Sequence, residues 1–315
     1  MVNLTKKIIQ LSKNQVKKNI YNSFKKDVNF DNRSKNSDNV VMVLAGYKSY
    51  FWDDFFARIF KFVPDSYDVV VISSGKVSDP LSKICKAHNW SYISSAKNNV
   101  SLLQNIAVDL FPLAKYIYKI DEDIFITKHF FSGLKKTMDY AEAKGKYKVS
   151  FVAPLTNVNG YSYSILLDYF HARSIYEKEF GRAFIESGPR NKIETNSEIA
   201  KFMWGKGGYL PMIDEMDDTL GDLPFSFSIC PIRFSIGAIL YPRYVWEQIG
   251  GFPVNFGNGM GVDEEKINGI SINYSISRVP YISENTVVGH GGFGSQARAL
   301  KNFFESHPEI TKLKS

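Results

Sequence analysis

Three consecutive acidic residues, Asp121-Glu122-Asp123, follow an apolar run from Tyr116 to Ile120. If the run is a β-strand, the triplet lies at its carboxyl end, where Asp121 and Asp123 can point to one side. Carboxylate oxygens suit Mg²⁺ or Mn²⁺, and a diphosphate can complete the coordination. The ion would offset charge that builds on a departing diphosphate. A bare Asp-x-Asp is often only an acidic turn, but its place after a predicted strand favours a Mn²⁺ or Mg²⁺ site with Asp123 and Asp121 as ligands and Glu122 turned away.

A second acidic cluster, Asp263-Glu264-Glu265, follows a glycine-rich stretch at 250–261. The cluster opens a predicted helix, and the helix dipole lowers the pKa of a carboxyl group in the first turn. A carboxylate there can take a proton from an attacking hydroxyl group, and glycines let backbone and substrate approach closely. Asp263 and Glu264 are therefore candidate general bases, and the choice between them stays open. The alternative is that these acids only stabilise the start of the helix.

His290 lies among glycines in the segment 289–292. A side chain with such neighbours is sterically open, as a ligand must be, and imidazole binds Mn²⁺. A single histidine is more often structural. Together with the acidic triplet, however, His290 is a candidate third metal ligand.

Three further residues are weaker candidates for contacts with a ligand. Tyr47 follows the first predicted strand and Ser74 ends the second, where a nucleotide base and its ribose would lie. Tyr47 could stack on the base, although an exposed loop tyrosine is an equal alternative. Trp204 lies among glycines at 204–208 and could close over a sugar as part of a lid, or it could be a core residue beside a turn.

The spacing of apolar residues predicts strands that alternate with helices. Strands are expected at 40–44, 68–72, 90–93 and 116–120, and helices at 52–62, 80–88 and 100–111. Later strands are expected at 149–154 and 235–240, later helices at 242–249 and 263–275, and mixed helices and loops at 160–223. Such alternation predicts an α/β protein with a parallel sheet covered by helices on both faces. Ligands of these sheets bind beyond the carboxyl ends of the strands, where the acidic triplet lies.

Most of the net charge of +7 comes from the N-terminus. Up to residue 38 there are nine lysines and arginines against three aspartates, which gives +6, so the rest of the chain is nearly neutral. We expect a basic helical arm at 1–37, which includes a helix at 4–26 and joins through a polar linker at 31–39, and one large domain at 38–315. The helix could lie on an anionic membrane surface or pack on its own domain or a partner. A nucleic-acid enzyme would carry basic residues on its folded body, so we expect no nucleic-acid partner.

The two cysteines, Cys85 and Cys230, are far apart and match neither a disulfide framework nor a zinc pattern. Both are expected to be buried thiols. The chain has no run of eighteen apolar residues and no signal-peptide pattern at its N-terminus. The sequence therefore predicts a cytoplasmic protein, with the basic arm as the segment that would hold it on the inner face of the membrane.

The residues around the triplet resemble glycosyltransferases of the GT-A fold. An asparagine-rich turn and a helix precede the strand that ends in the acids, as in the inverting family-two pattern; the matching residues are Lys97-Asn98-Asn99 and Gln104-Asn105. The resemblance implies that Asp121 and Asn105 contact the nucleotide-sugar donor and that Asp123 binds the metal.

The second half of the chain looks like the acceptor half of β-1,4-galactosyltransferases and their relatives, with a glycine-rich turn, an acidic cluster and a later histidine that helps to bind the metal. The resemblance implies that Glu264, as the middle acid, is the base. Two positions depart from the family: Phe256 stands nearest to where a tryptophan is expected, which makes it a candidate acceptor contact, and the order Asp263-Glu264 replaces Glu-Asp. The likeness is scattered over 40–294.

Together these likenesses imply a GT-A fold with a mixed, mainly parallel sheet, a donor half at about 38–130 and an acceptor half at about 131–300. They imply transfer of a hexose, with inversion, from a UDP-sugar to a hydroxyl of a glycan or glycolipid, as in surface polysaccharide synthesis, with Mn²⁺ or Mg²⁺. Two alternatives stay open. One is a retaining transferase or a sugar nucleotidyltransferase on a related fold, although 45–49 holds only one glycine and one lysine. The other is a non-catalytic homologue that binds glycan or docks on a membrane.

Overall fold

The computed structural model describes residues 19, 22, 23, 25–188, 190–254, 261–272 and 278–313. Most of the helix expected at 4–26 lies outside these residues, and so do Phe256 and positions 273–275 of the last predicted helix.

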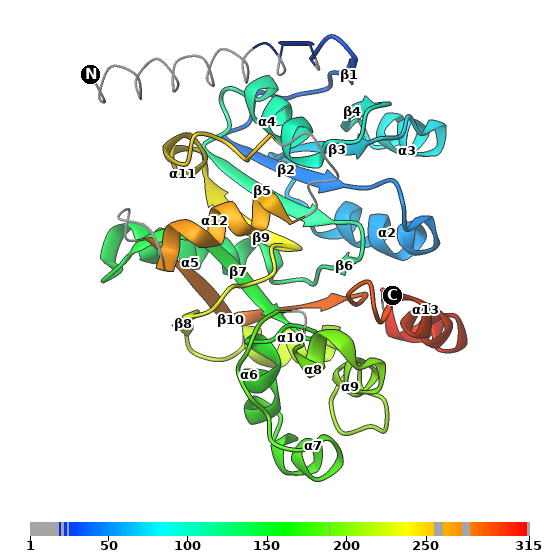
Figure 1. The fold of residues 1–315 in the computed structure, drawn as a ribbon, viewed down its shortest axis with the longest axis vertical. Helices are drawn as coiled ribbons and strands as arrows, with labels where there is room; N and C mark the ends of the chain where they lie inside the picture. Colours follow the sequence, from blue (N-terminus) through cyan, green and yellow to red (C-terminus); the bar gives the residue numbers. More distant parts are fainter. Residues whose placement is uncertain are drawn as a thin grey trace, which may run out of the picture.

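The described strands form one ten-stranded sheet through the centre of the molecule, with helices on both sides (Figure 1). Its order is β1-β4-β3-β2-β5-β9-β7-β10-β6, and β8 pairs with β10 beside this path. The strands are β1 (Val28–Asp31), β2 (Asn39–Leu44), β3 (Asp68–Ser74), β4 (Ser91–Ser95), β5 (Tyr116–Asp121), β6 (Ile124–Phe125), β7 (Lys148–Thr156), β8 (Phe227–Ile229), β9 (Ala238–Pro242) and β10 (Arg278–His290).

Six of the described strands run in one direction. β4, β3, β2 and β5 pair in parallel, and so do β7 and β10, while β9 lies antiparallel between β5 and β7. β1, β6 and β8 join antiparallel. The prediction of a mixed, mainly parallel sheet flanked by helices is confirmed. The central strands are apolar because both faces are covered, and all seven residues of β3 are buried.

Helices cover both faces of the sheet. Successive side chains of β2 point to opposite faces. Val41 and Val43 belong to a hydrophobic cluster that also contains residues of α2, α3 and α5, whereas Val40 and Met42 belong to a cluster that contains residues of α4 and α11. The helices are α2 (Trp52–Phe62), α3 (Asp79–Ala87), α4 (Val100–Leu110), α5 (Phe130–Lys144), α6 (Ser162–Tyr169), α7 (Arg173–Phe180), α8 (Lys192–Thr195), α9 (Ser197–Met203), α10 (Ile213–Gly221), α11 (Arg243–Gln248), α12 (Val262–Ile272) and α13 (Ala297–Ser306), with 3-10 turns η1 (Ser49–Phe51) and η2 (Pro308–Ile310).

The predicted elements of the first half lie within two residues of their expected bounds. α2 coincides with its prediction: Phe55 and Ile59, one turn apart, are buried, Lys61 is exposed, and Pro64 follows the end of the helix. Three long elements were not predicted, namely α5, β10 and α13. β10 was missed because the polar pair Glu284-Asn285 interrupts its apolar pattern, at a point where its pairing with β7 also shifts register.

Residues 28–37 are hydrogen-bonded to the central sheet, although we expected them to be part of the basic arm and its linker. β1 pairs with β4 along the edge of the sheet. Beyond it, Ser34 Oγ donates to Asp68 at 2.8 Å, and the backbone N–H groups of Lys35 and Ser37 donate to the same carboxylate at 2.5 and 3.0 Å. The polar composition suggested a free linker because this buried acceptor on β3 is distant in the sequence.

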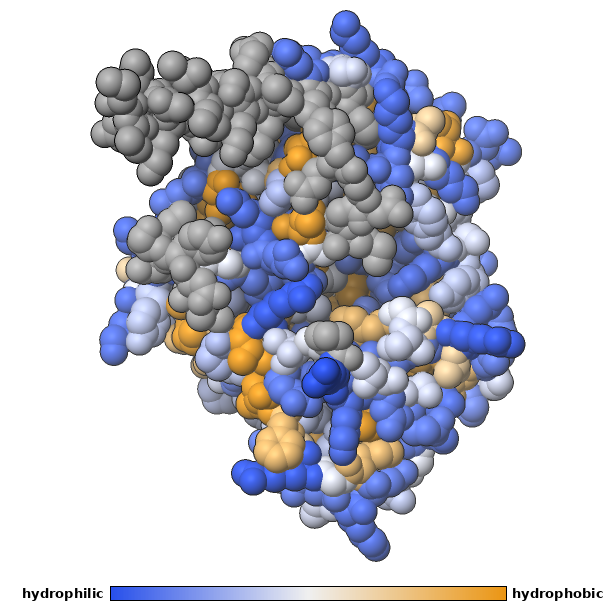
Figure 2. Space-filling view, viewed as in Figure 1, coloured by the Kyte–Doolittle hydropathy of each residue, from blue (hydrophilic) through white to orange (hydrophobic). Residues whose placement is uncertain are grey.

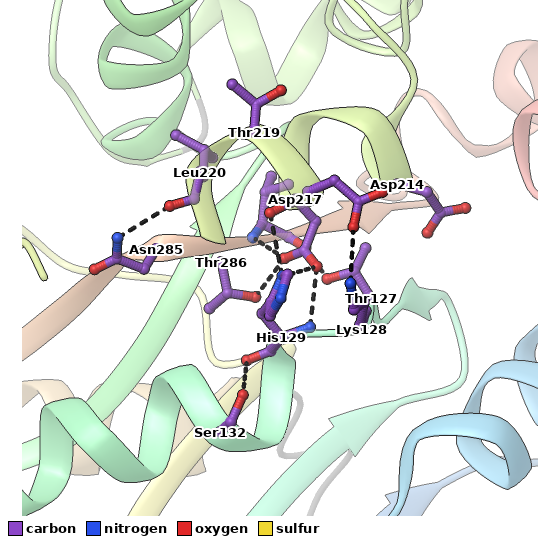
Figure 3. A network of polar contacts seen from close by, with 12 residues as sticks. Thr127, Lys128, His129, Ser132, Asp214, Asp217, Thr219, Leu220, Asn285 and Thr286 are labelled. Carbon is purple, nitrogen blue, oxygen red and sulfur yellow. Dashed lines mark hydrogen bonds and ion pairs between the residues drawn. The ribbon is translucent and has the colours of Figure 1, made fainter. Parts of the chain in front are cut away.

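The stretch at 160–223 folds mainly as helices, α6 to α10. α10 is tied to the sheet through Asp217, which is fully buried. Its carboxylate accepts hydrogen bonds from Thr286 Oγ1 at 2.9 Å, from the backbone of Val287 at 3.2 Å and from the backbone of His129 at 3.0 Å (Figure 3). This acid joins α10, β10 and the start of α5.

The described surface and core agree with a folded domain that keeps its apolar residues inside. On the face seen in Figure 2, the coloured residues are mostly hydrophilic and the apolar patches are small. Cys85 and Cys230 are buried free thiols, as expected. Within the described part of the chain, no helix has both the length and the apolar character needed to cross a membrane.

Candidate functional site

A cavity of about 610 Å³ opens at the carboxyl ends of β2, β3 and β5. This edge is where the strand pattern placed a ligand site. The cavity brings together seven of the residues selected from the sequence: Tyr47, Ser74, Asp121, Asp123, Asp263, Glu264 and His290. Its wall also contains Glu122 and three cations, Lys48, Lys119 and Arg233. None of the cations was selected as a site residue from the sequence, where Lys48 counted only as the single lysine of 45–49.

Glu122 holds the loop that follows β2. Its carboxylate accepts hydrogen bonds from the backbone of Gly46, Tyr47 and Lys48 at 2.8–2.9 Å and from the indole nitrogen of Trp52 at 2.6 Å. Four donors on one buried carboxylate fix the course of this loop. The middle acid of the triplet therefore points into the protein and positions Tyr47 and Lys48 on the cavity wall.

Asp121 is held by a buried lysine. Lys119 Nζ lies 2.7 and 2.8 Å from the two carboxylate oxygens of Asp121 and donates to the carbonyl oxygen of Ile236 at 2.8 Å. Burial opposes the charge on Lys119, but Asp121 and Asp263 outweigh it and raise the pKa of the ammonium group. Lys119 therefore keeps a fixed charge at the base of the cavity, and Asp121 has a fixed orientation.

Asp123 faces two nitrogen groups. Lys48 Nζ forms an ion pair with Asp123 Oδ2, and His290 Nε2 lies 3.6 Å from the same oxygen. Burial opposes ionisation of Asp123, but His290 and Lys48 outweigh it and hold the pKa of this carboxyl group well below its usual range. The site therefore contains a carboxylate that stays ionised in spite of being buried.

The ring of His290 has a defined orientation. Its Nδ1 lies 3.2 Å from the carbonyl oxygen of Val158, and its backbone N–H donates to Asn157 Oδ1 at 2.9 Å. A carbonyl oxygen only accepts, so Nδ1 carries a proton, and Nε2 is the ring nitrogen that faces Asp123. A backbone contact of this kind is typical of histidines that bind metals.

Asp123 and His290 fit a divalent ion. Two ligands at right angles, each about 2.1 Å from Mg²⁺, would be about 3 Å apart, and the observed 3.6 Å separation is close to this. Among the described residues, no three histidine, cysteine, aspartate or glutamate side chains form a complete metal cluster. The ion would therefore need further oxygens, and a diphosphate is the usual source of these for Mg²⁺.

The acids at the start of α12 form another part of the wall. Asp263 is buried, and its Oδ2 accepts from Gln104 Nε2 at 2.9 Å. Glu264 Oε1 lies 2.6 Å from Arg233 Nε. Burial raises the pKa of Glu264, and Arg233 and Lys119 only partly offset this. A carboxylate with a raised pKa is better able to accept a proton near neutral pH than an ordinary surface glutamate.

Two of the sequence-selected residues do not line the cavity. Asn105 is buried behind it, accepts from Trp246 Nε1 and the backbone of Phe252 at 2.9 and 2.8 Å, and donates to Phe252 O at 2.9 Å. Trp204 is 2% exposed, and its indole donates to the carbonyl oxygen of His290 at 2.9 Å. Asn105 thus supports the turn before the glycine-rich segment, and Trp204 supports the strand that carries His290.

Sequence reasoning missed the three cations of the cavity. Lys119 left a signal, because a lysine within the buried run 116–120 needs an anionic partner nearby. Lys48 and Arg233 left none, because their carboxylate partners are 75 and 31 residues away.

Comparisons with known proteins do not identify a family: no family model and no curated protein matches the chain. Among solved structures, the chain is similar to the mannosyltransferase PcManGT from Pyrobaculum calidifontis in complex with GDP-Man and Mn²⁺, with 12% identity and a TM-score of 0.46. It is also similar to S. aureus TarS 1-349, with 10% identity and a TM-score of 0.46. These matches cover 82% and 86% of this chain but only 58% and 64% of those chains. Because the similarity is this low, function is argued below from the site.

Proposed function

We propose that this protein is a metal-dependent glycosyltransferase of the GT-A type that moves a hexose from a nucleotide sugar, with a UDP-sugar as the expected donor, to a hydroxyl of a glycan or glycolipid. The observation that carries the proposal is that one cavity combines Asp123 and His290 with two further acids, the buried Asp263 and the half-buried Glu264. The first pair suits a diphosphate with its ion, and the second suits proton transfer from an acceptor.

We assign the donor half of the cavity to a nucleotide diphosphate. Tyr47, 62% exposed, offers a ring on which a base can stack, and its hydroxyl is held at 2.7 Å by the carbonyl oxygen of Ser74. We assign the ribose to Asp121 and Ser74, and the diphosphate with its ion to Asp123 and His290. When bound, the ion would offset the charge on the departing nucleoside diphosphate.

Glu264 is the base that we propose. It takes the proton of the acceptor hydroxyl while the hydroxyl oxygen forms a bond to the anomeric carbon and the bond from that carbon to the diphosphate breaks. Base and diphosphate lie on opposite sides of the sugar in such a step, which gives inversion. Asp263 remains the second candidate, and Gln104 would then orient it.

The loop at 46–48 disfavours a nucleotidyltransferase. Such an enzyme needs free backbone N–H groups in this loop to hold a triphosphate. Here the N–H groups of Gly46, Tyr47 and Lys48 are all directed to Glu122. A diphosphate held through an ion at Asp123 and His290 needs none of them.

A donor-hydrolysis and transfer assay tests the proposal. Purified protein is incubated with a panel of UDP- and GDP-sugars with Mn²⁺, with Mg²⁺ or with a chelator, and the released nucleoside diphosphate is measured. We expect release from at least one donor, lost with the chelator and lost in Asp123→Asn, but retained in the exposed control Asp139→Asn. Activity that persists in Asp123→Asn would rule out the metal role, and no nucleotide binding by any measure would favour the non-catalytic homologue.

A further inference from the structure

Two groups compete for one oxygen atom at the centre of the cavity. Lys48 Nζ is paired with Asp123 Oδ2, and His290 Nε2 faces the same oxygen from 3.6 Å. The ammonium group therefore occupies the carboxylate oxygen that an ion bridging Asp123 and His290 would need. Lys48 and the divalent ion cannot both bind that oxygen in the arrangement seen here.

Lys48 can leave this position, whereas its backbone cannot. The backbone N–H is fixed by Glu122 at 2.9 Å, but the side chain is 32% exposed and flexible along its methylene groups. Lys119, in contrast, is buried and makes three contacts below 3 Å. The side chain of Lys48 is therefore free to exchange one anionic partner for another while its backbone stays in place.

We propose that Lys48 couples the binding of the divalent ion to the binding of the nucleoside diphosphate. This inference rests on the proposed function and adds a positioning residue to it. An ion that binds alone must displace the ammonium group from Asp123 and so break its direct ion pair, without supplying a new anion in its place. A nucleoside diphosphate that coordinates the same ion brings phosphate oxygens next to Asp123, and Lys48 then pairs with these.

The coupling has a thermodynamic consequence in both directions. If the diphosphate strengthens ion binding by some factor, the ion must strengthen diphosphate binding by the same factor. Without the Lys48 ammonium group, the ion can bind Asp123 Oδ2 directly, and the free-energy cost of displacing the ammonium group disappears. Removing the lysine charge should therefore strengthen binding of the ion alone and weaken the coupling.

Titration of Mn²⁺ followed by electron paramagnetic resonance, which reports free Mn²⁺ without any turnover, tests this. The full chain is titrated alone and with UDP or GDP as wild type, as Lys48→Met and as Lys48→Arg. Lys76→Met is the matched control, because Lys76 lies in the neighbouring loop and donates to the carbonyl oxygen of Gly46, not to Asp123. Circular dichroism confirms that each variant is folded.

We expect Lys48→Met to bind Mn²⁺ alone about ten-fold more tightly than wild type, within the usual range of such couplings. The gain in Mn²⁺ affinity on adding the diphosphate should shrink by a similar factor in this variant, while Lys48→Arg and Lys76→Met should resemble wild type. Equal Mn²⁺ affinities in wild type and Lys48→Met, with equal gains from the diphosphate, would overturn the inference and leave the proposed function standing. If no variant bound Mn²⁺ even with diphosphate, the metal role in the proposed function would fail, and the inference with it.

Discussion

The indole nitrogen of Trp52 donates a hydrogen bond of 2.6 Å to Glu122, across the gap between the start of α2 and the end of β5. The same carboxylate holds the backbone of residues 46–48. One acid at the end of a strand thereby sets the position of a helix and of the loop that carries Tyr47 and Lys48. Among the three acids of the triplet, Glu122 is thus the one that organises the wall of the cavity.

Replacement of Glu122 by glutamine should loosen this loop. A glutamine side chain has one acceptor oxygen where the carboxylate has two, so some of the four donors lose their partner, and the free energy of unfolding should fall by about 1–3 kcal/mol. The affinity for UDP should fall as well, because Tyr47 is no longer fixed. Urea denaturation and isothermal titration measure the two effects. Glu247→Gln, on the exposed side of α11, is the control, and equal values for the two variants would contradict the role of Glu122.

The sequence predicted the parallel part of the fold well because the signal there is local. The strand that ends in Asp121 is an apolar run interrupted only by Lys119, with a buried helix before it, and both could be identified from neighbouring residues. β10 could not, because Glu284-Asn285 and the register shifts hide its pattern. The same distinction holds in the site. The acids and His290 stand in recognisable local patterns, whereas their partners Lys48 and Arg233 come from distant positions that only the fold brings together.

The two acids at the start of α12 should differ in their effect on catalysis. Glu264→Gln should lower kcat by about 100-fold or more, since the residue loses its ability to accept a proton. In wild type, activity should decline as the pH falls through the raised pKa of Glu264, because only the ionised carboxylate is a base. Rates over a pH series measure both effects.

The neighbouring acids are the controls for this assignment. Asp263→Asn keeps a side chain that can bond to Gln104, so it should retain more activity than Glu264→Gln, and the exposed Glu265→Gln should be nearly unaffected. An inactive Asp263→Asn beside an active Glu264→Gln would reassign the base to Asp263.

Stability should depend on pH through His129 and Asp217. His129 Nδ1 lies 3.0 Å from Asp217 Oδ2, and this contact raises the pKa of the imidazole above its usual value of about 6.5, with burial opposing (Figure 3). The folded state therefore favours protonated His129. The contribution of this pair to the free energy of unfolding is fully present below about pH 6.5. It is lost as the pH rises through the raised pKa of His129 in the folded protein.

Urea denaturation at a series of pH values from 5.5 to about 9 tests this linkage. Over this range, the free energy of unfolding should fall by about 1 kcal/mol more in wild type than in His129→Gln, the amount typical of a partly exposed charged hydrogen bond. His88→Gln, which alters a histidine stacked on Trp90, should follow the wild-type curve. Parallel curves for wild type and His129→Gln would show that the pair does not contribute in this way.

A methyl group at Gly289 should disturb the proposed metal site through the strand that carries His290. A Cβ atom there would lie 2.1 Å from the ring of Trp204, which is 2% exposed and packed edge-on against Phe125 and Phe304. The ring has no room to move, so the strand must shift, and this strand carries His290, whose carbonyl oxygen the indole also holds. We expect Gly289→Ala to lower the free energy of unfolding by about 1–3 kcal/mol and to weaken Mn²⁺ binding in the presence of UDP.

Gly294→Ala is the control, because a methyl group added there meets no atom within 4 Å. This variant should change neither the stability nor the Mn²⁺ affinity, which separates the packing effect at Gly289 from a general intolerance of the glycine-rich segment. If Gly289→Ala lowered stability but left Mn²⁺ affinity unchanged, Trp204 would support the fold of β10 without controlling the position of His290.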